Sequence, residues 1–131
     1  MSVGVWNPGG GGELVVSAEL LKEVVSVVRE ADLAQLGTSL PADFIAGKNT
    51  LMKQEAAAFA PAADLADEDL ELLIRFFTLA EMQLSGWEGG KKNPVIYLVK
   101  ILKDRGAFTP ELRKWVKGNT DNRYLPNGAV L

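Results

Sequence analysis

The sequence predicts an all-α protein: a single-domain bundle or orthogonal array of about five helices, with an extended N-terminal arm and a C-terminal strap. Apolar residues recur at the three- and four-residue spacing of an amphipathic helix in several stretches. Glycine and proline residues separate these stretches, as they do in short interhelical turns. No stretch shows a convincing strand pattern, and no internal repeat of about 20–50 residues is present.

The chain length of 131 residues fits one domain, and the hydrophobic fraction of 47% is ordinary for a globular protein. Residues 1–16 are predicted to be a glycine-rich arm, and residues 17–131 a helical domain with a joint near residues 56–66. No apolar run approaches the roughly 20 residues that a membrane span needs, and the first residues do not resemble a secretory signal. We therefore expect a cytoplasmic protein with no membrane partner.

The first helix is predicted to run from an N-cap at Ser17 to about Leu36, where Gly37 ends it. A second, looser helical pattern begins at Pro41, a residue type that suits a first helical turn. Pro61 lies inside the alanine-rich stretch that follows, and proline cannot occupy an uninterrupted helix interior. This stretch is predicted to join two helical halves, because its apolar side chains still need burial.

The strongest helical pattern lies in residues 67–87, and Asp64 or Asp67 is its expected N-cap. Apolar residues cover about 200° of its circumference at about 100° per residue. A helix that apolar must be contacted on several sides, so it is predicted to be the central one. Glu71 and Arg75 are four residues apart, in the order that favours an ion pair.

Two shorter helices are predicted in the last third of the chain. Asn93 and Pro94 are the expected cap and first residue of one helix, which Gly106 ends. The other helix is predicted at about residues 109–118, with a threonine cap and a proline at its first position.

Cysteine and histidine are both absent from the sequence. Without cysteine the chain has no disulfide, thiolate zinc site or cysteine nucleophile. Without histidine it lacks the most common general base and the most common transition-metal ligand. No cofactor or metal site is therefore expected. An enzyme is the third choice of function, and it would depend on carboxylates, with Glu81 or Asp121 as the acid or base.

Charge is unevenly distributed along the chain, although the net charge is only −3. Residues 64–90 hold seven acids and one base, whereas residues 91–131 hold nine bases and three acids. The favoured interpretation is that the acidic helix and the basic segment pack side by side. The alternative is that the basic third of the chain contacts phosphates.

Two stretches have the composition of a binding site. The stretch EGGKKNP, residues 88–94, combines glycine amides, two lysines and a helix N-terminus, which are the ingredients of an anion site. The stretch RKWVKGNTDNRY, residues 113–124, places bases beside aromatic rings on which nucleotides could stack. A plain turn and a core anchor with solvated charges are the favoured alternatives. The candidate anion-binding or nucleic-acid-binding residues are Lys91, Lys92, Asn93, Lys114, Lys117 and Arg123.

The leading functional prediction is a non-enzymatic protein–protein interaction module, which binds itself as a homodimer or binds another protein. Aromatic residues provide anchors for such an interface. The candidate interaction residues are Trp6, Trp87, Tyr124 and Leu131. The second choice is a protein that binds nucleic acid or a phosphate ligand through residues 91–123.

The chain ends in turn-forming residues followed by apolar ones. Residues 123–131 are therefore predicted to form a strap, in which Tyr124 and Leu125 pack on the bundle and the apolar terminus docks. The alternative is that the free carboxylate and the last apolar residues bind a partner that captures C-termini.

Overall fold

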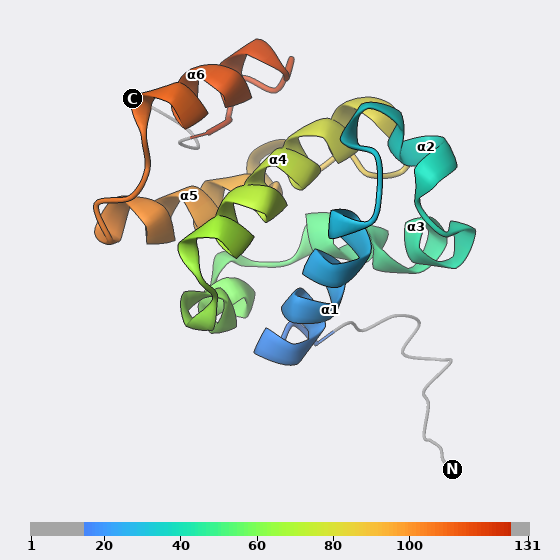
Figure 1. Cartoon of the computed structure of the whole chain (residues 1–131), viewed down its shortest axis with the longest axis horizontal. Helices are drawn as coiled ribbons and strands as arrows, with labels where there is room; N and C mark the ends of the chain where they lie inside the picture. The colour runs from blue at the N-terminus through green and yellow to red at the C-terminus, as the bar shows by residue number, and fades with distance from the viewer. Residues whose placement is uncertain (1–14, 127–131) are drawn as a thin grey trace.

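The computed structural model describes residues 15–126, and in this range the chain forms six α-helices and four 3-10 helices. The range contains no strand, so the predicted all-α class is confirmed. Figure 1 shows the helices packed around α4, which crosses the middle of the molecule. In chain order the elements are α1 (Ala18–Arg29), η1 (Leu33–Gln35), α2 (Leu36–Ser39), α3 (Ala42–Lys48), η2 (Asn49–Lys53), η3 (Ala56–Asp64), α4 (Asp67–Gln83), η4 (Gly90–Lys92), α5 (Val95–Asp104) and α6 (Pro110–Gly118).

Helix α4 is the central helix, as its apolar circumference predicts. It packs against α1, α2, α5 and α6, which lie on different sides of it (Figure 1). Because neighbours surround it, seven of its 17 residues are buried, and the hydrophobic effect stabilises this arrangement. The buried residues of α4 are Leu70, Leu73, Ile74, Phe76, Phe77, Thr78 and Ala80.

Helix α1 begins as predicted and ends earlier than predicted. The Ser17 hydroxyl accepts a hydrogen bond from the Leu20 amide at 3.0 Å, which is the expected N-cap. The helix ends at Arg29, and the chain then turns through Asp32, whose carboxylate accepts from the Ala34 amide at 2.9 Å. This short side-chain-to-backbone bond offers the chain an alternative to a continued helix.

The side chain of Gln83 holds the turn after α1 against the end of α4. Its oxygen accepts from the Leu36 amide at 2.8 Å, and its nitrogen donates to the Leu33 carbonyl at 2.8 Å. Both ends of the amide are thereby used to satisfy backbone groups of η1 and α2.

The alanine-rich stretch, predicted to join two helical halves, forms η3, a single 3-10 helix with Pro61 inside it that lies between η2 and α4. A 3-10 helix has three residues per turn, so side chains three apart lie in one row. Phe59, Ala62 and Leu65 form the buried row. The exposed row consists of Ala57, Ala60 and Ala63.

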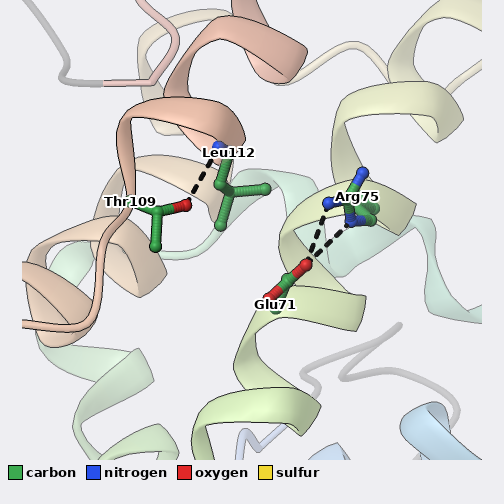
Figure 2. Close-up of polar contacts among 4 residues, drawn as sticks. All are labelled: Glu71, Arg75, Thr109 and Leu112. Carbon is green, nitrogen blue, oxygen red and sulfur yellow. Dashed lines mark hydrogen bonds and ion pairs between the residues drawn. The ribbon is translucent and has the colours of Figure 1, made fainter.

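Helices α5 and α6 follow at the predicted places. Thr109 caps α6 by accepting from the Leu112 amide at 3.1 Å (Figure 2). The same figure shows the predicted pair on α4, in which Arg75 donates to Glu71 at 2.9 Å. The Arg75 guanidinium also lies 4.7 Å from the centre of the Trp115 ring, so it links α4 to α6.

Trp87 belongs to the core, which corrects its prediction as an interaction residue. None of its surface is exposed. Its ring stacks on Phe44 at 6.2 Å and meets the edge of Phe76 at 5.6 Å, and its indole nitrogen donates to the Ile45 carbonyl at 3.0 Å. The side chain therefore anchors α3 to α4 and cannot reach a partner in this conformation.

The acidic and basic segments are neighbours, because α4 packs along α5 (Figure 1). Arg105 joins them by an ion pair with Asp67 at 2.7 Å. A second ion pair, between Arg29 and Asp69 at 2.7 Å, joins α1 to α4. In residues 15–126 no helix is long and apolar enough to cross a lipid bilayer.

Candidate functional site

The carboxylate of Glu81, on the last turn of α4, accepts four hydrogen bonds from described residues. One of its oxygens accepts from the amides of Gly89 at 2.8 Å and Gly90 at 3.0 Å. The other accepts from the side-chain nitrogens of Asn93 at 2.8 Å and Asn122 at 2.9 Å. We call Glu81 and these four donors the carboxylate cradle. It joins the end of α4 and the turn that follows it to Asn122, which is 41 residues from Glu81 along the chain.

The glycines of the cradle are required by its geometry. A Cβ on Gly89 would lie 2.9 Å from the Cα of Asn93, so a side chain there would collide with backbone. Gly90 has a φ of +55°, in the left-handed region that glycine adopts most easily. These two residues turn the chain so that successive amides point at the same oxygen.

The two asparagines are fixed by hydrogen bonds at their other ends. The side-chain oxygen of Asn93 accepts from the Val95 amide at 2.8 Å, which caps α5 as predicted. The side-chain oxygen of Asn122 accepts from the Tyr124 amide at 2.9 Å. These bonds fix both side chains, so that the side-chain nitrogens of Asn93 and Asn122 point toward Glu81.

Glu81 is held in its charged form. Partial burial raises the pKa of its carboxyl, but the hydrogen bonds from the cradle outweigh burial, so its pKa lies below the ordinary value of 4.5. Four donors also occupy the lone pairs that a catalytic base would use. Glu81 therefore has the surroundings of a carboxylate with a structural role, and these surroundings do not favour it as a catalytic acid or base.

The anion site predicted in residues 88–94 therefore binds an anion from the protein itself. Asn93 is fully buried within the cradle. Lys92 is turned away and forms an ion pair with Glu55 at 2.8 Å. Lys91 is the exposed base of this stretch. The favoured interpretation of this stretch was a plain turn with solvated lysines, and the structure shows an amide-rich turn that binds the carboxylate of Glu81.

The remaining basic candidates lie on α6 and the segment after it. Lys114 and Lys117 are exposed on α6, and Lys117 shares a hollow of about 250 Å³ with Arg123 and Asp121. Arg123 lies over the Tyr124 ring at 5.4 Å. Its hydrogen bond and its charge lower the pKa of the Tyr124 phenol, and the charge of Lys91 adds to this. These bases thus gather at one end of the molecule.

The segment after α6 packs on the bundle through Leu125, which is 3% exposed. Tyr124, predicted both to pack and to interact, is half-buried beneath Arg123. The candidate residues Trp6 and Leu131, with the rest of the predicted terminal strap, lie outside the described residues 15–126. Within the described residues the strap is docked by Leu125, and Asn122, the residue before the strap, is bonded to Glu81.

A groove runs between α5 and η3, and sequence reasoning did not find it. It encloses about 310 Å³, and its lining is mainly apolar because the small side chains of η3 form one wall. Phe59 and Tyr97 form its floor, with ring centres 5.6 Å apart. The residues that line this α5–η3 groove are Ala56, Ala57, Phe59, Ala60, Tyr97, Lys100, Ile101 and Asp104.

Polar contacts fix the two walls of the groove at both ends. At one end Glu55, just before η3, is paired with Lys92, just before α5. At the other end Arg105 donates to the Ala63 carbonyl at 2.7 Å and pairs with Asp67. The groove is thus formed before any ligand arrives. The three-residue period that places Phe59 inward and Ala57 and Ala60 outward was the signal in the sequence.

Neither a metal centre nor a known relative adds to this picture. Among residues 15–126 no group of three or more His, Cys, Asp or Glu side chains could hold a metal ion. No protein-family model, curated protein or solved structure matches the chain. The α5–η3 groove, the carboxylate cradle and the basic end are the features on which a function can rest.

Proposed function

We propose that this protein is a helical interaction module that binds a protein segment in the α5–η3 groove. The observation that carries the proposal is a preformed groove of about 310 Å³ with a mainly apolar lining. Apolar concave surfaces with a few polar groups at the rim are the usual form of a binding site. Lys100 and Asp104 provide that rim.

Preorganisation supports this function. The Glu55–Lys92 and Arg105–Asp67 pairs hold the two walls, so a ligand does not have to order them. Binding to an ordered site loses less conformational entropy than binding to a mobile one. The exposed residues of η3 that line the groove are alanines, and their small methyl groups leave this wall accessible to a ligand.

A catalytic role receives less support from the same geometry. Glu81 is charged and its oxygens are occupied within the carboxylate cradle. Asp121 is exposed in the hollow that it shares with Lys117 and Arg123. Acid–base catalysis needs two titrating groups in contrasting environments, and the charged residues that share the hollow with Asp121 are the bases Lys117 and Arg123.

Site-specific photo-crosslinking in the native cell tests this proposal. A photoreactive side chain at Ala56, on the groove rim, is expected to give defined protein adducts, and the same side chain at Ser26 on α1 is not. Ala60→Arg should fill the groove and abolish the adducts. Ala63→Arg is the matched control, because Ala63 lies in the same exposed row of η3 but outside the groove lining.

Two outcomes would contradict the groove as a docking site. One is the absence of protein adducts at Ala56. The other is an adduct pattern that Ala60→Arg and Ala63→Arg change to the same extent. The two variants should have unfolding midpoints close to that of the natural chain, because both positions are exposed.

The basic end supports a second candidate function, the binding of nucleic acid or another phosphate ligand. Arg113, Lys114 and Lys117 fall within about 100° of the circumference of α6, and all three are exposed. Arg123 faces the same hollow as Lys117. Phosphate contacts would make affinity fall steeply with salt.

Oligonucleotide titrations test this second function. Single-stranded and duplex probes at about 50 and 200 mM salt should show a strong salt dependence. Lys117→Glu should reduce binding, whereas Lys22→Glu, an exposed base on α1, should not. No binding at the lower salt concentration would end this candidate.

A further inference from the structure

We infer that the ligand of the α5–η3 groove is a second copy of the same chain, paired through α5 about a two-fold axis. The inference rests on the proposed function, because it requires the groove to bind protein. The shape of the groove and the charges at its rim indicate which protein the partner is.

The surface of α5 has a ridge between two hollows. One hollow is the α5–η3 groove, and the other encloses about 170 Å³ over Ile96 and Val99. Tyr97 and Lys100 line both hollows, so they form the ridge that separates them. Helices pack by inserting the ridge of one into the groove of the other. A surface that carries both a ridge and the hollows beside it can pack against a copy of itself.

The charges on this surface are also self-complementary. Lys100 and Asp104 are one helical turn apart, and both line the α5–η3 groove. Neither side chain forms an ion pair with another residue in the described range 15–126. In a two-fold pairing with α5 antiparallel to its copy, Lys100 of each chain faces Asp104 of the other. The same contact is then made twice, as an isologous interface requires.

Other modes of peptide binding fit the groove less well. Strand addition needs an exposed sheet edge, and the described residues contain no strand. Polyproline recognition uses grooves lined by several exposed aromatic rings, whereas of the two rings that line this groove Phe59 is almost completely buried and only Tyr97 is partly exposed. A foreign acidic helix would pair with Lys100 but would leave Asp104 facing like charge.

The expected dimer is weak. One helix face with the alanines of η3 is smaller than the roughly 800 Å² per partner of a standard stable interface. We therefore expect dissociation constants between about 1 µM and 1 mM. Light scattering over that range of concentrations should give a mass that rises from 14.1 kDa toward twice that value.

Charge exchange between the two rim residues provides the decisive test. Lys100→Asp and Asp104→Lys should each weaken the dimer by about tenfold, because each change turns two attractive contacts into two repulsive ones. The double variant, which exchanges the two charges, should restore dimerisation. Lys114→Asp, an exposed base on α6, is the control and should leave the dissociation constant unchanged.

Several outcomes would contradict the proposal that a second copy of the chain binds in the groove. A mass of 14.1 kDa at every concentration would overturn it. So would a dimer that neither single charge reversal weakens, or a double variant that stays as weak as the single ones. If the chain is monomeric but a different protein is crosslinked at Ala56 in a manner that Ala60→Arg abolishes, the docking function stands and only the second copy fails. If neither is observed, both proposals fail.

Discussion

Glu81 occupies the position that an external anion would take in an amide-rich turn. The sequence indicated such a turn through Gly89, Gly90 and the helix start at Asn93. It could not indicate the ligand, because the position of Glu81 above the turn depends on where α4 ends and how the chain reverses. Side-chain hydrogen bonds over such distances follow from the fold and not from local spacing.

At the same scale, Glu81→Gln is expected to lower the free energy of unfolding by about 1–3 kcal/mol. A glutamine presents one oxygen and one nitrogen, so its nitrogen must face amide donors of the carboxylate cradle. Chemical denaturation measures the change. Glu88→Gln is the control, since Glu88 is exposed and its side chain forms no ion pair with another described residue. Equal stability of the two variants would show that the carboxylate cradle contributes nothing to the free energy of unfolding.

The contribution of Glu81 should also depend on pH. Its folded-state pKa lies below the ordinary value of 4.5, so the unfolded chain binds this proton more readily than the folded one. The stabilisation is therefore complete above 4.5 and is lost as the pH falls through the lower, folded-state pKa. Unfolding free energies of the natural chain and Glu81→Gln, measured from about pH 7 to about pH 3, should converge at the acidic end. A constant difference would contradict this assignment.

At the scale of elements, helix starts were predicted more accurately than helix ends and types. The N-cap of α4 is an exception: it is Ala66, so the expected cap at Asp64 or Asp67 was wrong. Ser17, Asn93 and Thr109 each cap the helix that the sequence assigned to them, because a cap is a local interaction. The end of α1 was predicted too late, because Asp32 and Gln83 stabilise a turn through contacts that periodicity does not show. The 3-10 form of η3 was missed because alanine suits both helix types.

The turn between α4 and α5 should be sensitive to a single methyl group. Gly89→Ala is expected to destabilise the fold by about 1–3 kcal/mol, because its Cβ would press on the backbone of Asn93. Gly47→Ala is the contrasting variant: nothing lies within 4 Å of a Cβ there, and the residue is within α3. That change should stabilise by about 0.5–1 kcal/mol. Thermal unfolding of both variants provides the measurement. A shift of the unfolding midpoint in the same direction for both variants would contradict this prediction.

At the scale of the whole molecule, the sequence indicated the all-α class and the central position of α4. It did not indicate which elements pack together. Trp87 looked like an interface anchor because aromatic residues are common there, yet it fills the space between α3 and α4. The groove between α5 and η3 likewise depends on two elements that meet only in the folded chain.

The strap should contribute measurably to global stability. Deleting residues 124–131 removes Leu125 from the core, and losing a buried leucine costs about 2–5 kcal/mol. The unfolding midpoint is therefore expected to fall by more than about 5 °C. Leu125→Ala alone should cause most of the loss. An unchanged midpoint in both variants would show that the strap does not stabilise the bundle.

The carboxylate cradle has a kinetic consequence. The amide protons of Gly89 and Gly90 are bonded to Glu81, and the side chain of Asn122 is bonded to Glu81 and to the Gly90 carbonyl at 2.9 Å. Solvent deuterium can replace these protons only when the bonds open. Because Asn122 shares the bonds, the turn before α5 and the segment after α6 should open together as one cooperative unit. The exchange rates of the two glycine amides would then report how often the segment around Asn122 leaves the bundle.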